Sequence, residues 1–105
     1  MSAYQKAVQL LGSRPHFRRE LQAKLAQRGF PAEEIEEALD RLTEQGYLDD
    51  SKTAAGFVEQ RLSRNHEGRV RLRAELAKRG APAEAIEDAL AGLPEDDLEP
   101  AREAA

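Results

Sequence analysis

The feature that most constrains this chain is an internal repeat with a spacing of 51 residues. Residues 21–42 align without a gap on residues 72–93, and 14 of the 22 aligned pairs are identical. A weaker correspondence upstream pairs Ala7 with Val58 and Leu11 with Leu62. Repeats of this size are supersecondary units that bury their apolar faces against one another. The sequence therefore predicts two copies of one small module.

Each copy contains three segments with helical periodicity. In the first copy Tyr4, Ala7, Val8 and Leu11 lie on one face of a helix. Ala, Leu, Glu and Arg dominate the composition while Val and Ile are scarce, which favours helices over strands. We predict an all-α fold, an elongated helical bundle of tandem three-helix, helix-turn-helix-like repeats. Repeat 1 is expected at residues 1–47, repeat 2 at 48–93, and an acidic, disordered tail at 94–105.

Glycine and proline mark the expected helix ends. Gly29 and Gly80 stand where a left-handed residue would end the second helix of each copy, and Gly46 would end the third helix of the first copy. Pro31 and Pro82 are expected at the first position of the third helices. The aromatic residues that follow two of these ends are expected to pack against the helix, with base stacking as the alternative. They are Phe30 and Tyr47.

Charge is separated by helix. Residues 14–28 carry five basic residues and one acid, and residues 61–79 carry seven basic residues and two acids. Residues 33–50 and 84–103 each carry eight acids and one arginine. The net charge of −4 therefore conceals a dipolar surface. Such a surface suits a partner of mixed charge, for example a protein that itself carries DNA.

Two interpretations of the basic residues stay open. Exposed helix faces are ordinarily rich in charge, so a single arginine can be merely solvated or can pair with an acidic helix of the same bundle. The cluster of Arg69, Arg71 and Arg73, flanked by Arg61 and Arg64, is harder to explain in that way. Like charges repel one another unless a partner neutralises them.

No arrangement of catalytic residues is found. The chain has no Cys, and neither His16 nor His66 has a second histidine at i+3 or i+4, so we expect two surface histidines and no metal site. Asp49 and Asp50 could hold Mg²⁺, but a helix cap explains them better. No serine has a nearby base, and no glycine-rich loop could cradle phosphate. We therefore expect neither enzymatic activity nor a cofactor.

The start of the chain, Met1 to Leu11, has no continuous apolar stretch. Neither a signal peptide nor a membrane span is expected there. We predict a cytoplasmic monomer that makes no contact with membranes.

A set of short motifs resembles a known family. The first copy contains EL at Glu20–Leu21, KL at Lys24–Leu25 and RGF at Arg28–Phe30. The stretch GYLDD at Gly46–Asp50 is followed by A..FV..R at Ala54–Arg61, and the second copy contains G…L..EL..RG from Gly68 to Gly80. These motifs resemble those of the RecX family, regulators of the bacterial RecA recombinase. The resemblance covers about residues 4–93.

The resemblance implies tandem three-helix repeats without catalysis, which bind along the groove of RecA–DNA filaments. It implies modulation, usually inhibition, of ATP hydrolysis, strand exchange and the SOS response, and hence a role in DNA repair and homologous recombination. Some family members also bind DNA directly. The chain departs from the family pattern in three places. An acidic tail stands where members commonly have a third repeat, His16-Phe17 replaces a capping Ser, and Lys52-Thr53 replaces a charged–aromatic pair.

The leading hypothesis is thus a filament-groove binder whose cations meet DNA phosphates or acidic recombinase side chains. Its predicted binding residues are Arg18, Arg19, Lys24, Arg61, Arg64, Arg69, Arg71 and Arg73. The alternative is a small helix-turn-helix DNA-binding protein acting in transcription, although its third helix is acidic. A third hypothesis is a scaffold or adaptor whose charges are only solvated.

Overall fold

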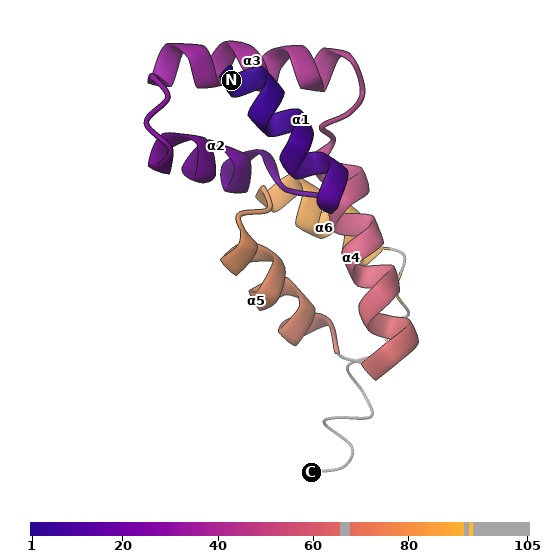
Figure 1. The fold of residues 1–105 in the computed structure, drawn as a ribbon. Helices are drawn as coiled ribbons and strands as arrows, with labels where there is room; N and C mark the ends of the chain where they lie inside the picture. Colours follow the sequence, from indigo (N-terminus) through magenta and orange to yellow (C-terminus); the bar gives the residue numbers. More distant parts are fainter. Residues whose placement is uncertain (66–67, 92, 94–105) are drawn as a thin grey trace, which may run out of the picture. The chain divides into compact units, whose positions relative to one another are not determined.

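The computed structural model describes residues 1–65, 68–91 and 93 of this chain (Figure 1). Within them it contains six α-helices and no strand, which confirms the predicted all-α class and the two sets of three helices. The helices are α1 (Ala3–Ser13), α2 (Arg18–Gln27), α3 (Ala32–Glu44), α4 (Asp50–Asn65), α5 (Arg69–Arg79) and α6 (Ala83–Ala91). The predicted acidic tail lies outside the described residues.

The chain divides into two compact units, Met1–Asp50 and Ser51–Ala105. This division comes after residue 50, whereas the sequence predicted a boundary after residue 47. The intervening residues belong to the first unit because Leu48 is only 3% exposed and joins its core, and because Asp50 accepts a hydrogen bond from Arg18.

In the first unit, α1 packs against both α2 and α3 (Figure 1). The alanines Ala3 and Ala7 are fully buried, and their small side chains let α1 approach α3 closely. The edge of this interface is closed by Tyr4, whose hydroxyl donates to Gln45 Oε1 at 2.8 Å and whose ring lies 4.1 Å from the guanidinium of Arg41. The remaining buried residues of this core are Leu21, Leu25, Ile35, Ala38, Leu39, Leu42 and Leu48.

The start of α1 carries a capping box. Ser2 Oγ accepts from the Gln5 N–H at 3.1 Å, and Gln5 Oε1 accepts from the Ser2 N–H at 3.0 Å. The two bonds satisfy donors that the first turn of a helix leaves unpaired. The Ser-x-x-Gln spacing is the sequence signal from which this capping box could have been predicted.

The three glycine helix ends are confirmed, with φ of 89° at Gly29, 83° at Gly46 and 98° at Gly80. After Gly29, the Phe30 N–H donates to the Leu25 carbonyl at 3.3 Å, and the Phe30 ring packs against the core as predicted.

Tyr47 makes the equivalent backbone bond, to the Leu42 carbonyl at 3.0 Å. Its side chain is nevertheless 69% exposed, so the predicted packing of this ring against the helix is wrong. The next residue, Leu48, enters the core in its place.

The prolines lie one position earlier than predicted. Pro31 is the N-cap of α3, not its first helical residue, because its ψ of 149° is extended. Its carbonyl accepts from the Ile35 N–H at 3.0 Å, and the Pro82 carbonyl accepts from the Ile86 N–H at the same distance. In either position the N–H that proline lacks is one that the helix does not use.

The second unit also contains three helices, and in it α5 packs against α6. The buried apolar residues described in this unit are Ala54, Val58, Leu72, Leu76, Ala85, Ile86 and Leu90. Over the described part of the chain, no helix combines the length and apolarity that a bilayer crossing needs.

Candidate functional site

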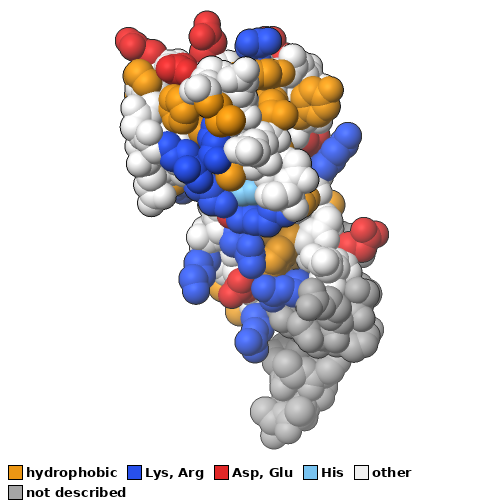
Figure 2. All heavy atoms as spheres, viewed as in Figure 1, with side chains coloured by type: hydrophobic (Ala, Val, Ile, Leu, Met, Phe, Trp, Pro, Cys, Tyr) orange, Lys and Arg blue, Asp and Glu red, His pale blue; other side chains and the backbone are white. Residues whose placement is uncertain are grey.

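Lys and Arg side chains gather over α2 in the first unit and over α5 in the second, while acidic side chains cover α3 (Figure 2). The ion pairs made within each unit decide which cations are left for a partner. A guanidinium already bound to a carboxylate is largely neutralised by that contact. The predicted residues fall into two groups on this criterion.

Arg18, the first residue of α2, contacts its own unit. Its Nη2 lies 2.8 Å from Asp40 Oδ1 and 3.0 Å from Glu36 Oε2, both on α3. Its backbone N–H donates to Asp50 Oδ1 at 2.9 Å. The side chain is 31% exposed. Arg18 therefore joins α2 to α3, and little of its charge is left uncompensated.

Arg19, Lys24 and Arg28 make no ion pair with any described carboxylate. Arg19 is exposed. Lys24 in the last turn of α2 and Arg28, the C-cap of this helix, line a hollow of about 390 Å³ with Gln27 and with Leu10 of α1. Uncompensated cations in a concave surface concentrate the positive potential there, so this basic hollow is the part of the first unit best suited to an anion. Arg28 was not among the predicted binding residues, although its i+4 spacing from Lys24 predicts a shared face.

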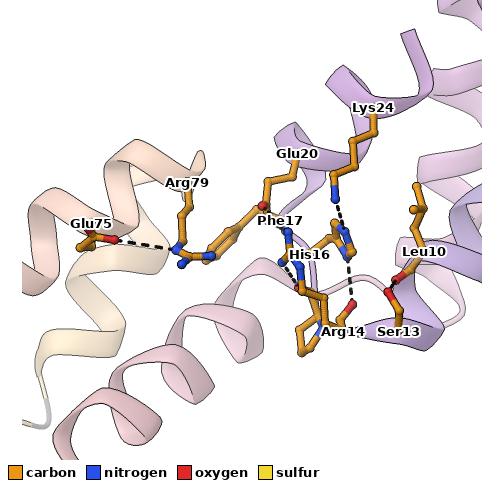
Figure 3. A network of polar contacts seen from close by, with 10 residues as sticks. Leu10, Ser13, Arg14, His16, Phe17, Glu20, Lys24, Glu75 and Arg79 are labelled. Atoms are coloured by element: carbon orange, nitrogen blue, oxygen red, sulfur yellow. Dashed lines mark hydrogen bonds and ion pairs between the residues drawn. The ribbon is translucent and has the colours of Figure 1, made fainter. Parts of the chain in front are cut away.

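His16, predicted to lie at the surface, is only 1% exposed. Its Nδ1 lies 2.9 Å from the Arg14 carbonyl oxygen, and its Nε2 lies 2.8 Å from Lys24 Nζ (Figure 3). Because the lysine ammonium can only donate, we assign a neutral ring that accepts at Nε2 and donates from Nδ1. The prediction was wrong because the link between α1 and α2 has no periodicity that would indicate burial.

Burial lowers the pKa of His16. The hydrogen bond to the Arg14 carbonyl opposes this effect, while the positive charges of Arg14 and Lys24 reinforce it. The ring is therefore held in its neutral form beside the basic hollow. The other histidine, His66, lies outside the described residues.

The start of α2 is held by two carboxylates. Phe17 is its N-cap and has no side-chain acceptor. Glu20 Oε1 accepts from the Phe17 N–H at 2.9 Å, and Glu20 Oε2 pairs with Arg14 at 3.0 Å (Figure 3). Burial would raise the pKa of Glu20, but these two hydrogen bonds outweigh it and the pKa is lowered. The second carboxylate is that of Asp50, whose pKa burial raises despite the bond from Arg18.

In the second unit, three of the predicted arginines contact their own unit. Arg73 makes a two-pronged ion pair with Glu87 of α6, at 2.9 Å and 3.0 Å. This hydrogen bonding raises the pKa of Arg73 and lowers the pKa of Glu87. Arg61 lies 4.6 Å from the Phe57 ring centroid and 3.5 Å from Glu75 Oε1. Arg69 Nη1 donates to the Leu93 carbonyl at 3.2 Å.

Arg71 differs from these neighbours. Its side chain is exposed and has no partner among the residues that the structure describes. It is the third residue of α5, whose N-cap is Gly68 and whose first turn contains no acid. The equivalent residue of the first unit is Glu20, which accepts a backbone N–H there. Arg64 belongs to α4, but its side chain is not among those that the structure describes.

Asp50 is the first residue of α4, and its carboxylate accepts a hydrogen bond from the Arg18 N–H at the start of α2. Across the described ranges, no three His, Asp or Glu side chains come together in a way that could hold a metal ion.

Comparison with known proteins places these features in a family. The description "RecX, first three-helix domain" matches residues 3–42, and "RecX, second three-helix domain" matches residues 49–90. The crystal structure of RecX from Lactobacillus salivarius has a TM-score of 0.81 at 24% identity, over 85% of this chain and 58% of that one. A second crystal structure, of regulatory protein RecX, has a TM-score of 0.82 at 27% identity, over 96% and 50%.

The relatives named Regulatory protein RecX include one from Xanthomonas axonopodis pv. citri and one from Vibrio vulnificus. The one from Xanthomonas axonopodis pv. citri is 41% identical over 99 residues, which are 94% of this chain and 60% of that protein. The one from Vibrio vulnificus is 36% identical over 105 residues, which are 100% of this chain and 68% of that protein. The chain thus spans about three fifths to two thirds of the length of these relatives. With both three-helix domains matched in order, the chain belongs to the RecX family.

Proposed function

We propose that this chain is a regulator of the RecA recombinase that binds along RecA–DNA filaments. In this proposal it acts as an inhibitor, modulating ATP hydrolysis, strand exchange and the SOS response by binding and not by catalysis. Membership of the RecX family supports the proposal, because relatives of the chain are named regulatory proteins. The chain's own residues support it through the placement of their cations.

The observation that carries the proposal is the position of Arg71. The start of a helix bears a partial positive charge, which favours acids there and disfavours cations. In the first unit the third helical position is taken by Glu20, which follows this rule. In the second unit the same position holds an exposed arginine with no described partner. A cation placed against the helix dipole is stabilised when an anion from another molecule neutralises it.

The proposed contact surface has two parts. The uncompensated cations at the basic hollow and at the starts of α2 and α5 make its primary part, where phosphates of DNA or carboxylates of the recombinase would bind. Cations already bonded within a unit make its secondary part, where a partner must compete for the charge. The primary residues are Arg19, Lys24, Arg28 and Arg71, and the secondary residues are Arg18, Arg61, Arg69 and Arg73. Arg64 is kept in the proposal on its sequence position alone.

The test is the rate of ATP hydrolysis by RecA on single-stranded DNA while the chain is added, together with co-sedimentation on assembled filaments. The wild-type chain should lower the rate and sediment with filaments at micromolar concentration. Arg71→Glu should weaken both effects by about tenfold or more, because a repulsion replaces an attraction. The same substitution should raise the unfolding midpoint, since it supplies the acid that the start of α5 lacks.

The matched control is Lys78→Glu, which makes the same charge change at an exposed position of α5 outside the proposed contact surface. This control should leave filament binding nearly unchanged. Equal losses of filament binding for the two variants would contradict the role given to Arg71. An unchanged ATPase rate with wild-type protein would overturn the proposed function itself.

The alternative, a helix-turn-helix protein of transcription, makes a different prediction. It requires tight duplex binding in the absence of RecA, with a steep dependence on salt. Helix α3 is unsuited to a major groove, because Glu33, Glu36, Glu37 and Asp40 are exposed along it. Duplex binding without RecA that exceeds filament binding would favour this alternative.

A further inference from the structure

The second unit contains a groove between α4 and α6. It has a volume of about 480 Å³ and a mostly apolar lining. Its lining includes Ala55, Val58 and Leu62 of α4, Ala89 of α6 and Leu93 just beyond it. All of these residues belong to the second unit, so the groove is a property of that unit alone.

The repeat explains why the groove is open. The residue equivalent to Ala55 in the first unit is Tyr4, whose ring closes the edge of the α1–α3 interface. The residue equivalent to Arg41, which covers that ring at 4.1 Å, is Gly92. The second copy thus lacks both side chains that fill this place in the first copy.

Burial of the surrounding residues agrees with this account. In the first unit Ala38 is 3% exposed and Leu42 is fully buried. Their equivalents, Ala89 and Leu93, are only half-buried and line the groove. Apolar surface that one copy keeps from water is therefore left open to solvent in the other. Covering it is favourable in proportion to the area removed from water.

The rim of the groove indicates the charge of what would fill it. Glu59 and Asp88 both line the groove and are exposed, and Lys52 is the one basic residue among the lining side chains. Acids beside an apolar hollow favour an incoming residue with a positive charge. The first unit shows such a pair within a single chain, where the ring of Tyr4 is covered by the guanidinium of Arg41.

We propose that the α4–α6 groove is a docking site for a partner protein segment that inserts an aromatic side chain with an arginine or lysine beside it. The inserted pair would reproduce in trans the Tyr4–Arg41 arrangement of the first unit. The ring would cover Ala89 and Leu62, and the cation would face Glu59 and Asp88. Aromatic anchors that fill a preformed pocket are a common source of binding energy at protein interfaces. This inference is independent of the proposed function, because it uses none of the basic residues assigned there.

The test uses a helical peptide that carries one tyrosine with an arginine four residues later, titrated into the full chain labelled at its methyl groups. Methyl resonances of Ala55, Val58, Leu62 and Ala89 should shift together, while those of Leu10 and Leu11 in the first unit should not. The same peptide with its tyrosine replaced by alanine should bind at least about tenfold more weakly. Equal binding of the two peptides, or no shift at all, would overturn the proposal.

A substitution in the chain itself gives a second test of the proposal. Ala55→Tyr restores the residue that the first unit has, so it should fill the groove from within. The variant should bind the tyrosine peptide at least about tenfold more weakly and should keep or raise its unfolding midpoint, which separates a filled groove from a misfolded unit. Its matched control is Ala74→Tyr, an exposed position of α5 outside the groove lining, which should leave peptide binding unchanged.

Two other occupants have distinct signatures. Shifts of the groove methyls that grow with protein concentration and accompany dimer formation would assign the groove to a second copy of the chain. Shifts of the same methyls caused by Leu98→Ala without peptide would assign it to the chain's own acidic segment. Either result would overturn the assignment to a partner protein.

Discussion

The two units have the same order of three helices, each set with its own buried residues, and we compare them at two places on the surface. At each place the side chains of one unit pair with or cover one another, whereas the equivalent place in the other unit is left exposed to a partner. At the first position the hollow of the first unit is lined by Lys24 and Arg28 without a carboxylate. The residue equivalent to Lys24 in the second unit is Glu75, which lies 3.5 Å from Arg61 and 3.9 Å from Arg79. Two other lining residues, Leu10 and Gln27, are also replaced in the second unit, by Arg61 and Lys78. The change from lysine to glutamate therefore supplies a carboxylate that pairs with Arg61 and Arg79, whereas the hollow of the first unit has none.

At the second position it is the first unit whose surface is filled by its own side chains and the second unit whose surface is open. Tyr4 and Arg41 close the α1–α3 edge in the first unit, whereas the second unit has the open α4–α6 groove. The identical residues of the repeat are concentrated in the buried stripes and at the helix ends, which fix the fold. The differences lie on the surface, where they leave a basic hollow on one copy and an apolar, acid-rimmed groove on the other. The duplicated core thus carries two different binding chemistries.

The largest expected effect separates two equivalent leucines. Leu42→Ala should lower the free energy of unfolding by roughly 2–5 kcal/mol, because Leu42 is fully buried and its removal leaves a cavity. Leu93→Ala should cost only about 1 kcal/mol, because Leu93 is half-buried at the groove. Urea unfolding of the two variants measures the difference. Equal losses would mean that the groove is filled in solution.

The next prediction exchanges the charges of the two units. Lys24→Glu places in the first unit the carboxylate that the second unit has, within reach of Arg28. Affinity for RecA filaments on single-stranded DNA should fall by about tenfold, and the dependence of binding on salt should become less steep. Lys78→Glu is the control, since this exposed lysine of the second unit lines neither the basic hollow nor the groove. A similar loss for both variants would show that only net charge matters.

The helices and their ends were predictable because they depend on residues close in sequence. Apolar spacing located the buried stripes, and the glycines at 29, 46 and 80 marked the turns by their freedom to take positive φ. Even so, Pro31 and Tyr47 were misplaced, since backbone position at a cap and burial at a turn depend on what packs nearby. Leu48, for example, takes the core position that was expected for Tyr47.

The candidate site was predictable only as a list of cations. Arg18 bonds to Asp40, a residue 22 positions away, and Arg73 bonds to Glu87, 14 positions away. No spacing rule within one helix predicts such pairs, so the sequence did not separate the neutralised arginines from Arg71. Burial of His16 was missed for the same reason. One signal was available, because aligning the two copies places Arg71 opposite Glu20.

The third prediction concerns the dependence of the free energy of unfolding on pH, which we assign to a residue of the first unit. Because burial lowers the pKa of His16 below its ordinary value of about 6.5, the unfolded chain binds this proton more readily than the folded chain does. The contribution of the neutral His16 ring to the free energy of unfolding is therefore fully present above pH 6.5. It is lost as the pH falls below this value, by up to about 1.4 kcal/mol per pH unit for one proton.

Urea unfolding between pH 7.5 and pH 5 measures this dependence. His16→Gln should flatten the slope in this range, because the amide can still bond to Lys24 or to the Arg14 carbonyl but does not titrate. Groups facing the ring besides these two include Glu20, whose pKa is lowered and whose own effect lies at more acidic pH. A slope that persists in the glutamine variant would assign the pH dependence to other groups.

The smallest effects distinguish the starts of the two equivalent helices α2 and α5. Asp50→Ala removes the acceptor of the Arg18 N–H and should cost about 1 kcal/mol, as for the loss of an N-terminal cap. Asp50→Asn should cost less, because the amide oxygen still accepts and burial already raises the pKa of this aspartate, so the charge itself adds little. In the second unit Gly68→Ser should stabilise α5 by a few tenths of a kcal/mol, since its N-cap has no side-chain acceptor. Thermal unfolding measures all three, and an Asp50→Ala variant as stable as wild type would show that Glu20 alone holds the start of α2.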